Sequence, residues 1–136
     1  MHAALPLPRL RVLALCVLLA SLGGCTREIH VTVVESHDLR PRFVLGHSAE
    51  GIPEAIPVNE IRVVPEDDGR WDYGHPTWCA SLDPGTFEPV TDVRYGETPS
   101  GFGRCAATRP LQFGHRYLVS VSGAGVVAKT EFQAGR

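Results

Sequence analysis

From residue 28 onward, apolar and polar residues alternate in short runs that turn residues separate. A period of two is typical of β-strands with one buried face, and no segment keeps the 3.6-residue period of a helix. In "EIHVTVVE" the alternation places Ile29, Val31 and Val33 on one face. Similar runs follow at 42–46, 58–64, 77–82, 89–96, 101–108, 115–123 and 126–132. The pattern predicts an all-β fold, a β-sandwich of seven to eight short antiparallel strands.

The first residues of the chain have a different pattern. Arg9 and Arg11 precede an uninterrupted uncharged run from Val12 to Leu22. A positive leader before an apolar core of about 7 to 15 residues describes a helical secretory signal peptide. The run is shorter than the roughly 20 apolar residues that a membrane-spanning helix needs. An ordinary signal peptide with a chance cysteine after it is the plain alternative.

The end of this run resembles the lipobox of bacterial lipoproteins. Leu22, Gly23 and Gly24 directly precede Cys25, and in that family the cysteine at this place receives a diacylglyceryl group through a thioether. The chemistry suits a thiolate, which is the strongest side-chain nucleophile. Two or more acyl chains, palmitate among them, anchor a protein stably in a bilayer. The resemblance therefore implies a protein that is bound to membrane lipid through an acylated Cys25.

The resemblance also implies a division of the chain. Residues 1–24 are expected to be the removed lipoprotein signal peptide, residues 25–28 a lipidated tether, and residues 29–136 the β-sandwich domain. Residue 26 is Thr, whereas Asp at this place tends to retain Gram-negative lipoproteins at the inner membrane. The expected location is therefore the cell envelope, lipid-anchored at the outer membrane and facing the periplasm.

Charge and composition limit the partners of the mature part. All 15 acidic residues of the chain but only 11 of its 13 basic residues follow the leader, so the formal charge of the mature part is −4. No basic patch or arginine-rich run is present, which argues against a nucleic-acid partner. We expect a non-catalytic binding or structural module whose partner is another envelope protein. A small envelope enzyme or metal-binding carrier is the alternative.

Cys79 and Cys105 are the two thiols that remain once the leader is removed and Cys25 is acylated. Exported proteins fold in an oxidising compartment, so we expect these two to form a disulfide. Free thiols are one alternative, and a metal site is another, although it would need two more ligands. In "TWCASL" the alternation directs Trp78 and Ala80 to the core and Cys79 outward. The bridge should therefore join a strand to a neighbouring strand or loop on the outside of the sandwich.

One local motif resembles fibronectin type III and related immunoglobulin-like domains. In "LQFGHRYLVSV", Leu111, Gly114 and Tyr117 match the tyrosine corner that leads into the sixth strand of those domains. Phe113 stands where the family has Pro. The resemblance implies that the Tyr117 hydroxyl bonds to backbone a few residues upstream.

Other candidate sites give weaker signals. The segment "PEDDGRWDYGHP" places Glu66, Asp67, Asp68, Asp72 and His75 in one loop. Its carboxylate oxygens could hold Ca²⁺. However, the spacing of an EF-hand loop is absent, and Asp and Gly are common in turns. The histidines after the leader show no metal-pair spacing, and the chain has no Gly-x-Ser-x-Gly motif. We therefore expect no catalytic residue, no cofactor and no metal.

The segment "YGETPSGFGRC" is the most unusual part of the mature chain. It is similar to a Tyr-Gly-x-x-Pro-x-Gly-Phe stretch of small bacterial lipoproteins that have no assigned role. One interpretation is a recognition loop that exposes Tyr95, Pro99 and Phe102 at one end of the sandwich. The other is a wide hairpin whose aromatic side chains cover the edge of the core.

Overall fold

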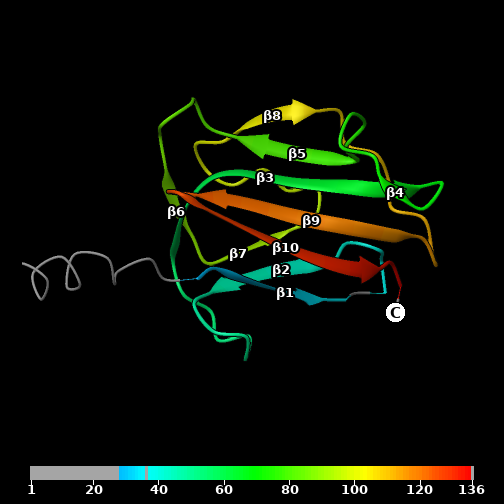
Figure 1. Ribbon diagram of the computed structural model, residues 1–136, viewed down its shortest axis with the longest axis horizontal. Coiled ribbons are helices and arrows are strands. Elements are labelled where there is room, and N and C mark those ends of the chain that lie inside the picture. The colour runs from blue at the N-terminus through cyan, green and yellow to red at the C-terminus, as the bar shows by residue number, and fades with distance from the viewer. Residues whose placement is uncertain (1–27, 36, 136) are drawn as a thin grey trace, which may run out of the picture.

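The computed structural model describes residues 28–35 and 37–135, which form two antiparallel β-sheets and no helix (Figure 1). The signal peptide, Cys25 and the tether up to residue 27 lie outside the described residues. The strands are β1 (His30–Val34), β2 (Arg42–Gly46), β3 (Ile56–Asp67), β4 (Arg70–Trp71), β5 (Trp78–Ser81), β6 (Glu88–Val90), β7 (Asp92–Arg94), β8 (Gly103–Ala106), β9 (Arg116–Gly123) and β10 (Val126–Gln133). The prediction of an all-β sandwich is confirmed.

The strand order is that of an immunoglobulin-like sandwich. The smaller sheet has the order β1-β2-β7, and the main path of the larger sheet has the order β10-β9-β3-β5-β8. These correspond to the A-B-E and G-F-C strand groups of immunoglobulin-like domains. β4 and β6 pair with β3 outside this path. β8 is an addition to the pattern, because the chain between β7 and β9 crosses to the far edge of the larger sheet and pairs with β5.

Ten strands are present among the described residues, more than the eight predicted. The main difference lies in the run 89–96, predicted as one strand. The structure divides it into β6, which pairs with β3, and β7, which pairs with β2. The change of sheet occurs at Thr91, whose carbonyl accepts the N–H of Leu45 at 2.9 Å. Pro89 has no N–H to donate, which is consistent with the short pairing of β6.

The alternating residues of both sheets form the core between them. Phe43 and Leu45 enter from the smaller sheet, and Ile61, Val63 and Trp78 enter from the larger one. The aromatic rings interlock: Phe43 stacks on Trp78 with 6.1 Å between ring centroids. The Trp78 ring is fully buried, and its Nε1 atom has no hydrogen-bond partner among the described residues. Packing of the indole must therefore outweigh the cost of a buried unpaired donor.

The sandwich has two distinct ends, and they are separated by the length of its strands. The described chain begins at one end, beside the β9–β10 turn and the β2–β3 loop (Figure 1). We call this the tether end. Here a Cβ atom on Gly46 would clash with the backbone oxygen of Ile52, so the β2–β3 loop lies directly against β2. The β1–β2 loop, the end of β7 and the β8–β9 connection meet at the opposite end, which we call the distal end.

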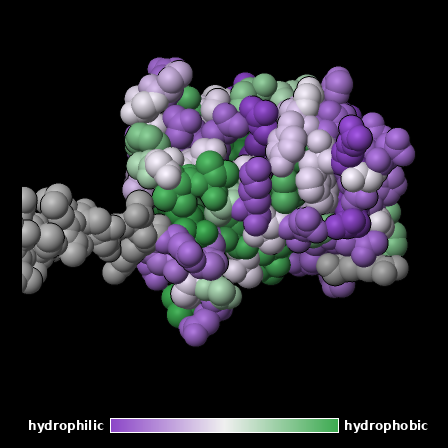
Figure 2. Space-filling model, viewed as in Figure 1, coloured by the Kyte–Doolittle hydropathy of each residue, from purple (hydrophilic) through white to green (hydrophobic). Residues whose placement is uncertain are grey.

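Hydrophobic surface is visible at the tether end. Figure 2 shows a green area beside the point at which the described chain begins, near the start of β10. Val127 in β10 is 56% exposed and Ile52 in the β2–β3 loop is 52% exposed, which identifies two of the apolar side chains at this end. Between residues 28 and 35 and between 37 and 135, no helix has the length and apolarity that crossing a membrane requires.

Candidate functional site

A cleft of about 400 Å³ lies at the distal end. Its walls come from three segments that are far apart in the sequence: the β1–β2 loop, the residues after β7, and the β8–β9 connection. The main lining residues are Leu39, Arg40, Tyr95, Arg109, Pro110 and Leu111. Apolar side chains form most of this surface, and its charged residues are Arg40, Arg109 and Asp38. We refer to it as the distal cleft.

Tyr95 holds one wall of the distal cleft in place. Its ring is 3% exposed, and its hydroxyl donates to the carbonyl of Arg109 at 2.5 Å, with the carbonyl of Thr77 at 3.1 Å. The N–H of Arg109 donates to the same Thr77 carbonyl at 2.8 Å. Burial raises the pKa of Tyr95 to about 12, so the phenol keeps its proton and remains a donor at neutral pH. Both the N–H and the carbonyl of Arg109 are therefore held by hydrogen bonds.

The recognition-loop interpretation expected exposed side chains at Tyr95, Pro99 and Phe102, and this expectation was wrong for the two aromatic residues. Tyr95 is not an exposed recognition side chain, because its ring packs edge-on against Trp78 at 5.5 Å between centroids. Phe102 is partly buried and packs against the core, and Pro99 is half-buried. Tyr95 and Phe102 pack against the core, as the other interpretation predicted, but the segment is not a hairpin, because it crosses from β7 in the smaller sheet to β8 in the larger one. A tyrosine between a strand and a glycine resembles an exposed turn in sequence, because the partners that bury it lie elsewhere in the chain.

A second tyrosine anchors the other end of the β8–β9 connection. The Tyr117 hydroxyl accepts the N–H of Gln112 at 2.8 Å, which is the upstream bond that the resemblance implies. Leu111 and Tyr117 are both buried, and Gly114 has a left-handed φ of 81° that favours glycine. Phe113, which replaces the usual Pro, is 68% exposed. The two tyrosines together hold the connection between Arg109 and Gln112, which forms one wall of the distal cleft.

The opposite wall contains a left-handed backbone position. Leu39 has a φ of 57°, which is uncommon for a residue with a side chain. The N–H of Arg40 donates to the Asp38 carboxylate at 3.2 Å across this turn. Leu39 packs against the core cluster, so its burial helps to offset the backbone cost. Backbone strain of this kind often occurs at ligand sites.

Arg40 and Arg109 differ in their contacts. Arg40 forms an ion pair with Glu97 at 3.3 Å, between groups that are largely exposed. Arg109 donates from Nη2 to the carbonyl of His75 at 2.6 Å, and no carboxylate in the described part of the chain pairs with it. A guanidinium has five N–H donors, and the hydrogen bond to His75 uses one of them. Arg109 is therefore the better positioned of the two to bind an added anion.

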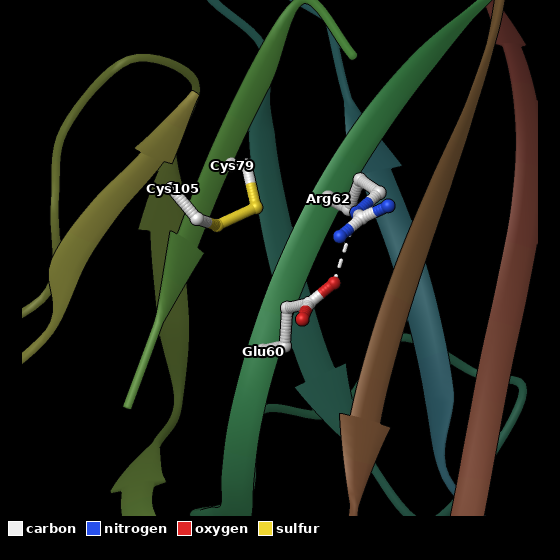
Figure 3. The surroundings of a disulfide bond; sticks show 4 residues. All are labelled: Glu60, Arg62, Cys79 and Cys105. Atoms are coloured by element: carbon white, nitrogen blue, oxygen red, sulfur yellow. Dashed lines mark ion pairs between the residues drawn. A yellow bond between two sulfur atoms is a disulfide. The ribbon is translucent and has the colours of Figure 1, made fainter. Parts of the chain in front are cut away.

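Cys79 and Cys105 form the predicted disulfide, which joins β5 to β8. Cys79 lies opposite Arg62 in the strand register, so the bridge is on the outer face of the larger sheet, as predicted (Figure 3). Cys79 is nevertheless only 1% exposed, whereas Cys105 is exposed. The Arg62–Glu60 ion pair, 2.9 Å long, lies beside the bridge. The disulfide thus fastens the edge strand that leads into the distal cleft wall.

The acidic residues predicted to share one loop are divided between the end of β3, the β3–β4 turn and the segment after β4, and several form local contacts. Glu66 pairs with Arg116 at 2.9 Å, and Asp72 lies 3.1 Å from the Nδ1 atom of His75. Asp67 and Asp68 are exposed at the β3–β4 turn. Across 28–35 and 37–135, no group of three or more His, Cys, Asp or Glu side chains is arranged to hold a metal ion.

Comparison with models of known protein families finds no match for this chain, and comparison with curated protein sequences finds none either.

Proposed function

We propose that the protein is a lipid-anchored protein of the bacterial cell envelope, and that its β-sandwich is a non-catalytic binding module with the distal end as its working surface. The observation that carries this proposal is the separation of the two ends. The sequence that resembles a lipobox leads into the tether end, and the distal cleft lies at the other. Ile29 follows Cys25 by four residues, so the tether spans about 14 Å at most.

The surface of the two ends supports this orientation. Val127 and Ile52 add exposed apolar surface next to the tether, where a lipid bilayer would lie. The distal cleft is at the far end of β1, and five strand residues correspond to roughly 15 Å. A partner near the membrane surface can therefore reach the cleft, whereas a partner far across the envelope cannot.

The anchor is tested by intact-mass measurement of the native product. We expect a chain that starts at Cys25 and carries diacylglyceryl and acyl groups, and we expect Cys25→Ser to abolish both processing and membrane association. Cys16→Ser is the matched control, because Cys16 leaves with the leader and its loss should change neither result. An unmodified thiol at position 25, or an uncut leader, would remove the basis of the proposal.

The membrane is tested by separating inner and outer membranes of the host. The wild-type protein should fractionate with the outer membrane, and Thr26→Asp should shift it to the inner membrane. A wild-type protein that remains with the inner membrane contradicts the outer-membrane placement but leaves the anchor intact.

The orientation is tested with a photo-reactive amino acid placed at Ile52 or at Phe113. A probe at Ile52 should crosslink to phospholipid, and a probe at Phe113 should crosslink to protein in the envelope. Lipid adducts from Phe113 that equal those from Ile52 would contradict the orientation.

Metal analysis of the purified protein tests the other class of function: stoichiometric zinc, copper or calcium would favour a metal carrier over a binding module.

A further inference from the structure

The distal cleft continues into an exposed apolar surface. Leu39 forms part of the cleft wall, and both Leu39 and Phe113 approach the position of a Cβ atom on Gly135. Phe113 is the most exposed of the large apolar side chains in the described residues. An apolar path therefore runs from the cleft past Gly135 to Phe113. Contiguous exposed apolar surface of this kind marks an interaction site more often than scattered apolar residues do.

Two arginines line the cleft, and two more lie on the outer face of the smaller sheet near the distal end. Arg40 and Arg109 line the cleft. Arg42 and Arg94 lie directly opposite each other on β2 and β7, and both are exposed. Like charges at directly opposed positions of an antiparallel pair are destabilising unless other groups compensate.

The acidic groups at this end offset the arginines only in part. Glu97 faces Arg40 at 3.3 Å, and Asp38 faces Arg94 at 3.9 Å. Both pairs are solvent-exposed, so each is worth little and can be exchanged for another partner. The mature chain has a formal charge of −4, yet this end presents four guanidinium groups. Among the residues that line the cleft, the guanidinium groups of Arg40 and Arg109 exceed the single carboxylate, that of Asp38, by one charge, and this excess favours an anionic ligand.

We propose that the distal cleft binds an extended peptide segment of an envelope protein in which a carboxylate side chain is next to an apolar side chain. The apolar side chain enters the cleft between Leu39 and Leu111, and the carboxylate pairs with Arg109. The cleft is open to solvent and not enclosed, which suits a chain that inserts one side chain better than a small molecule that must be enclosed. Arg109 suits this role because its backbone is held by hydrogen bonds and its guanidinium is oriented by the hydrogen bond from Nη2 to the His75 carbonyl before binding.

This proposal rests on the proposed binding role: the envelope location of the partner depends on the lipid anchor, whereas recognition of a carboxylate beside an apolar side chain does not. Intact-mass measurement tests the lipid anchor and peptide titration tests the cleft, so either proposal can be refuted without the other. The probes are three synthetic peptides: acetyl-Gly-Leu-Asp-Gly-amide, the same peptide with Asn in place of Asp, and the same peptide with Ala in place of Leu. The processed protein, ¹⁵N-labelled and purified in detergent, is titrated with each probe, and amide chemical shifts are recorded. This measurement detects weak binding and reports its location.

We expect the Leu-Asp peptide to shift the amides of Gly96, Thr108, Arg109 and Leu111. The Asn and Ala probes should bind about tenfold more weakly, because each loses either the charge-assisted hydrogen bonds or the apolar contact. Arg109→Gln should reduce binding of the Leu-Asp peptide by about the same factor. Arg104→Gln is the matched control, since Arg104 is exposed on β8, outside the cleft, and its loss changes the net charge equally.

Three results would overturn the proposal. The first is the absence of shifts at the cleft up to the solubility limit of the peptide. The second is equal binding of the Asp and Asn probes, which would show that no carboxylate is recognised. The third is equal loss of binding in Arg104→Gln and Arg109→Gln, which would reduce the effect to net charge. The ¹⁵N–¹H spectrum of each variant without peptide shows directly whether its fold is retained.

Discussion

Replacing Tyr95 with Phe removes one oxygen atom from the centre of the distal cleft wall. The hydroxyl donates to the Arg109 carbonyl at 2.5 Å. Thr77 keeps a partner for its carbonyl in the variant, because the N–H of Arg109 still donates to it at 2.8 Å. The loss is therefore one hydrogen bond and one partly buried carbonyl without a partner. Together these correspond to about 2 kcal/mol of unfolding free energy.

Thermal unfolding followed by circular dichroism measures this loss. A domain of this size loses about 4 °C in Tm for each 1 kcal/mol, so we expect Tyr95→Phe to lower Tm by roughly 8 °C. Tyr117→Phe should lower it by about half as much, since the ring stays buried and the Gln112 N–H loses one acceptor. Tyr73→Phe is the control, because its side chain is 44% exposed and its hydroxyl accepts a surface hydrogen bond from Lys129 at 3.3 Å. A Tyr95→Phe effect no larger than that of Tyr73→Phe would refute the reasoning.

The ionisation of Tyr95 gives an independent measurement. Its folded-state pKa of about 12 lies above the ordinary value of 10.0, and burial is the main cause. The stability associated with the neutral phenol is complete below pH 10 and is lost as pH rises through 12. Absorbance titration should show a tyrosine transition near pH 12, and that transition should be missing in Tyr95→Phe.

Three further predictions concern the rest of the sandwich. The double variant Cys79→Ala/Cys105→Ala, which lacks the disulfide, should lose about 3 kcal/mol of unfolding free energy as measured by urea denaturation. This is the loop entropy expected for a separation of 26 residues. An unchanged unfolding free energy would contradict the prediction. Gly46→Ala should lower the unfolding free energy by about 1–3 kcal/mol in the same assay, because the added Cβ atom would clash with the backbone of the β2–β3 loop. Gly103→Ala is the control, since Gly103 has room for a methyl group. Equal effects of the two variants would argue against the close approach at Gly46. Burial raises the pKa of Glu35 above its ordinary value of 4.5, so the contribution of this carboxyl to folding stability is present below pH 4.5 and is lost as pH rises. Glu35→Gln should therefore stabilise the protein at pH 7 and not at pH 4. An equal change in unfolding free energy at both pH values would contradict this prediction.

The sequence pattern identified most of the sandwich because its signal is local. The period-two run after residue 28 placed Val31 on one face with Ile29 and Val33 without knowledge of the partner strand, and Val31 is buried in the core. The same alternation separated Trp78 from Cys79 and predicted a bridge on the outer face. Alternation reports which face a residue occupies, but it does not report which strand lies next to it. The division of the run 89–96 between two sheets was therefore missed.

The local sequence by itself determined the strand faces, the tyrosine corner around Tyr117 and the pairing of Cys79 with Cys105. Only the tertiary structure decided that Tyr95 is buried and that Leu39 and Arg109, some 70 positions apart in the chain, line the same cleft. The physical reason is range: side-chain alternation and turn geometry act over a few residues. The cleft forms only after two sheets have packed and the β8–β9 connection has crossed the distal end.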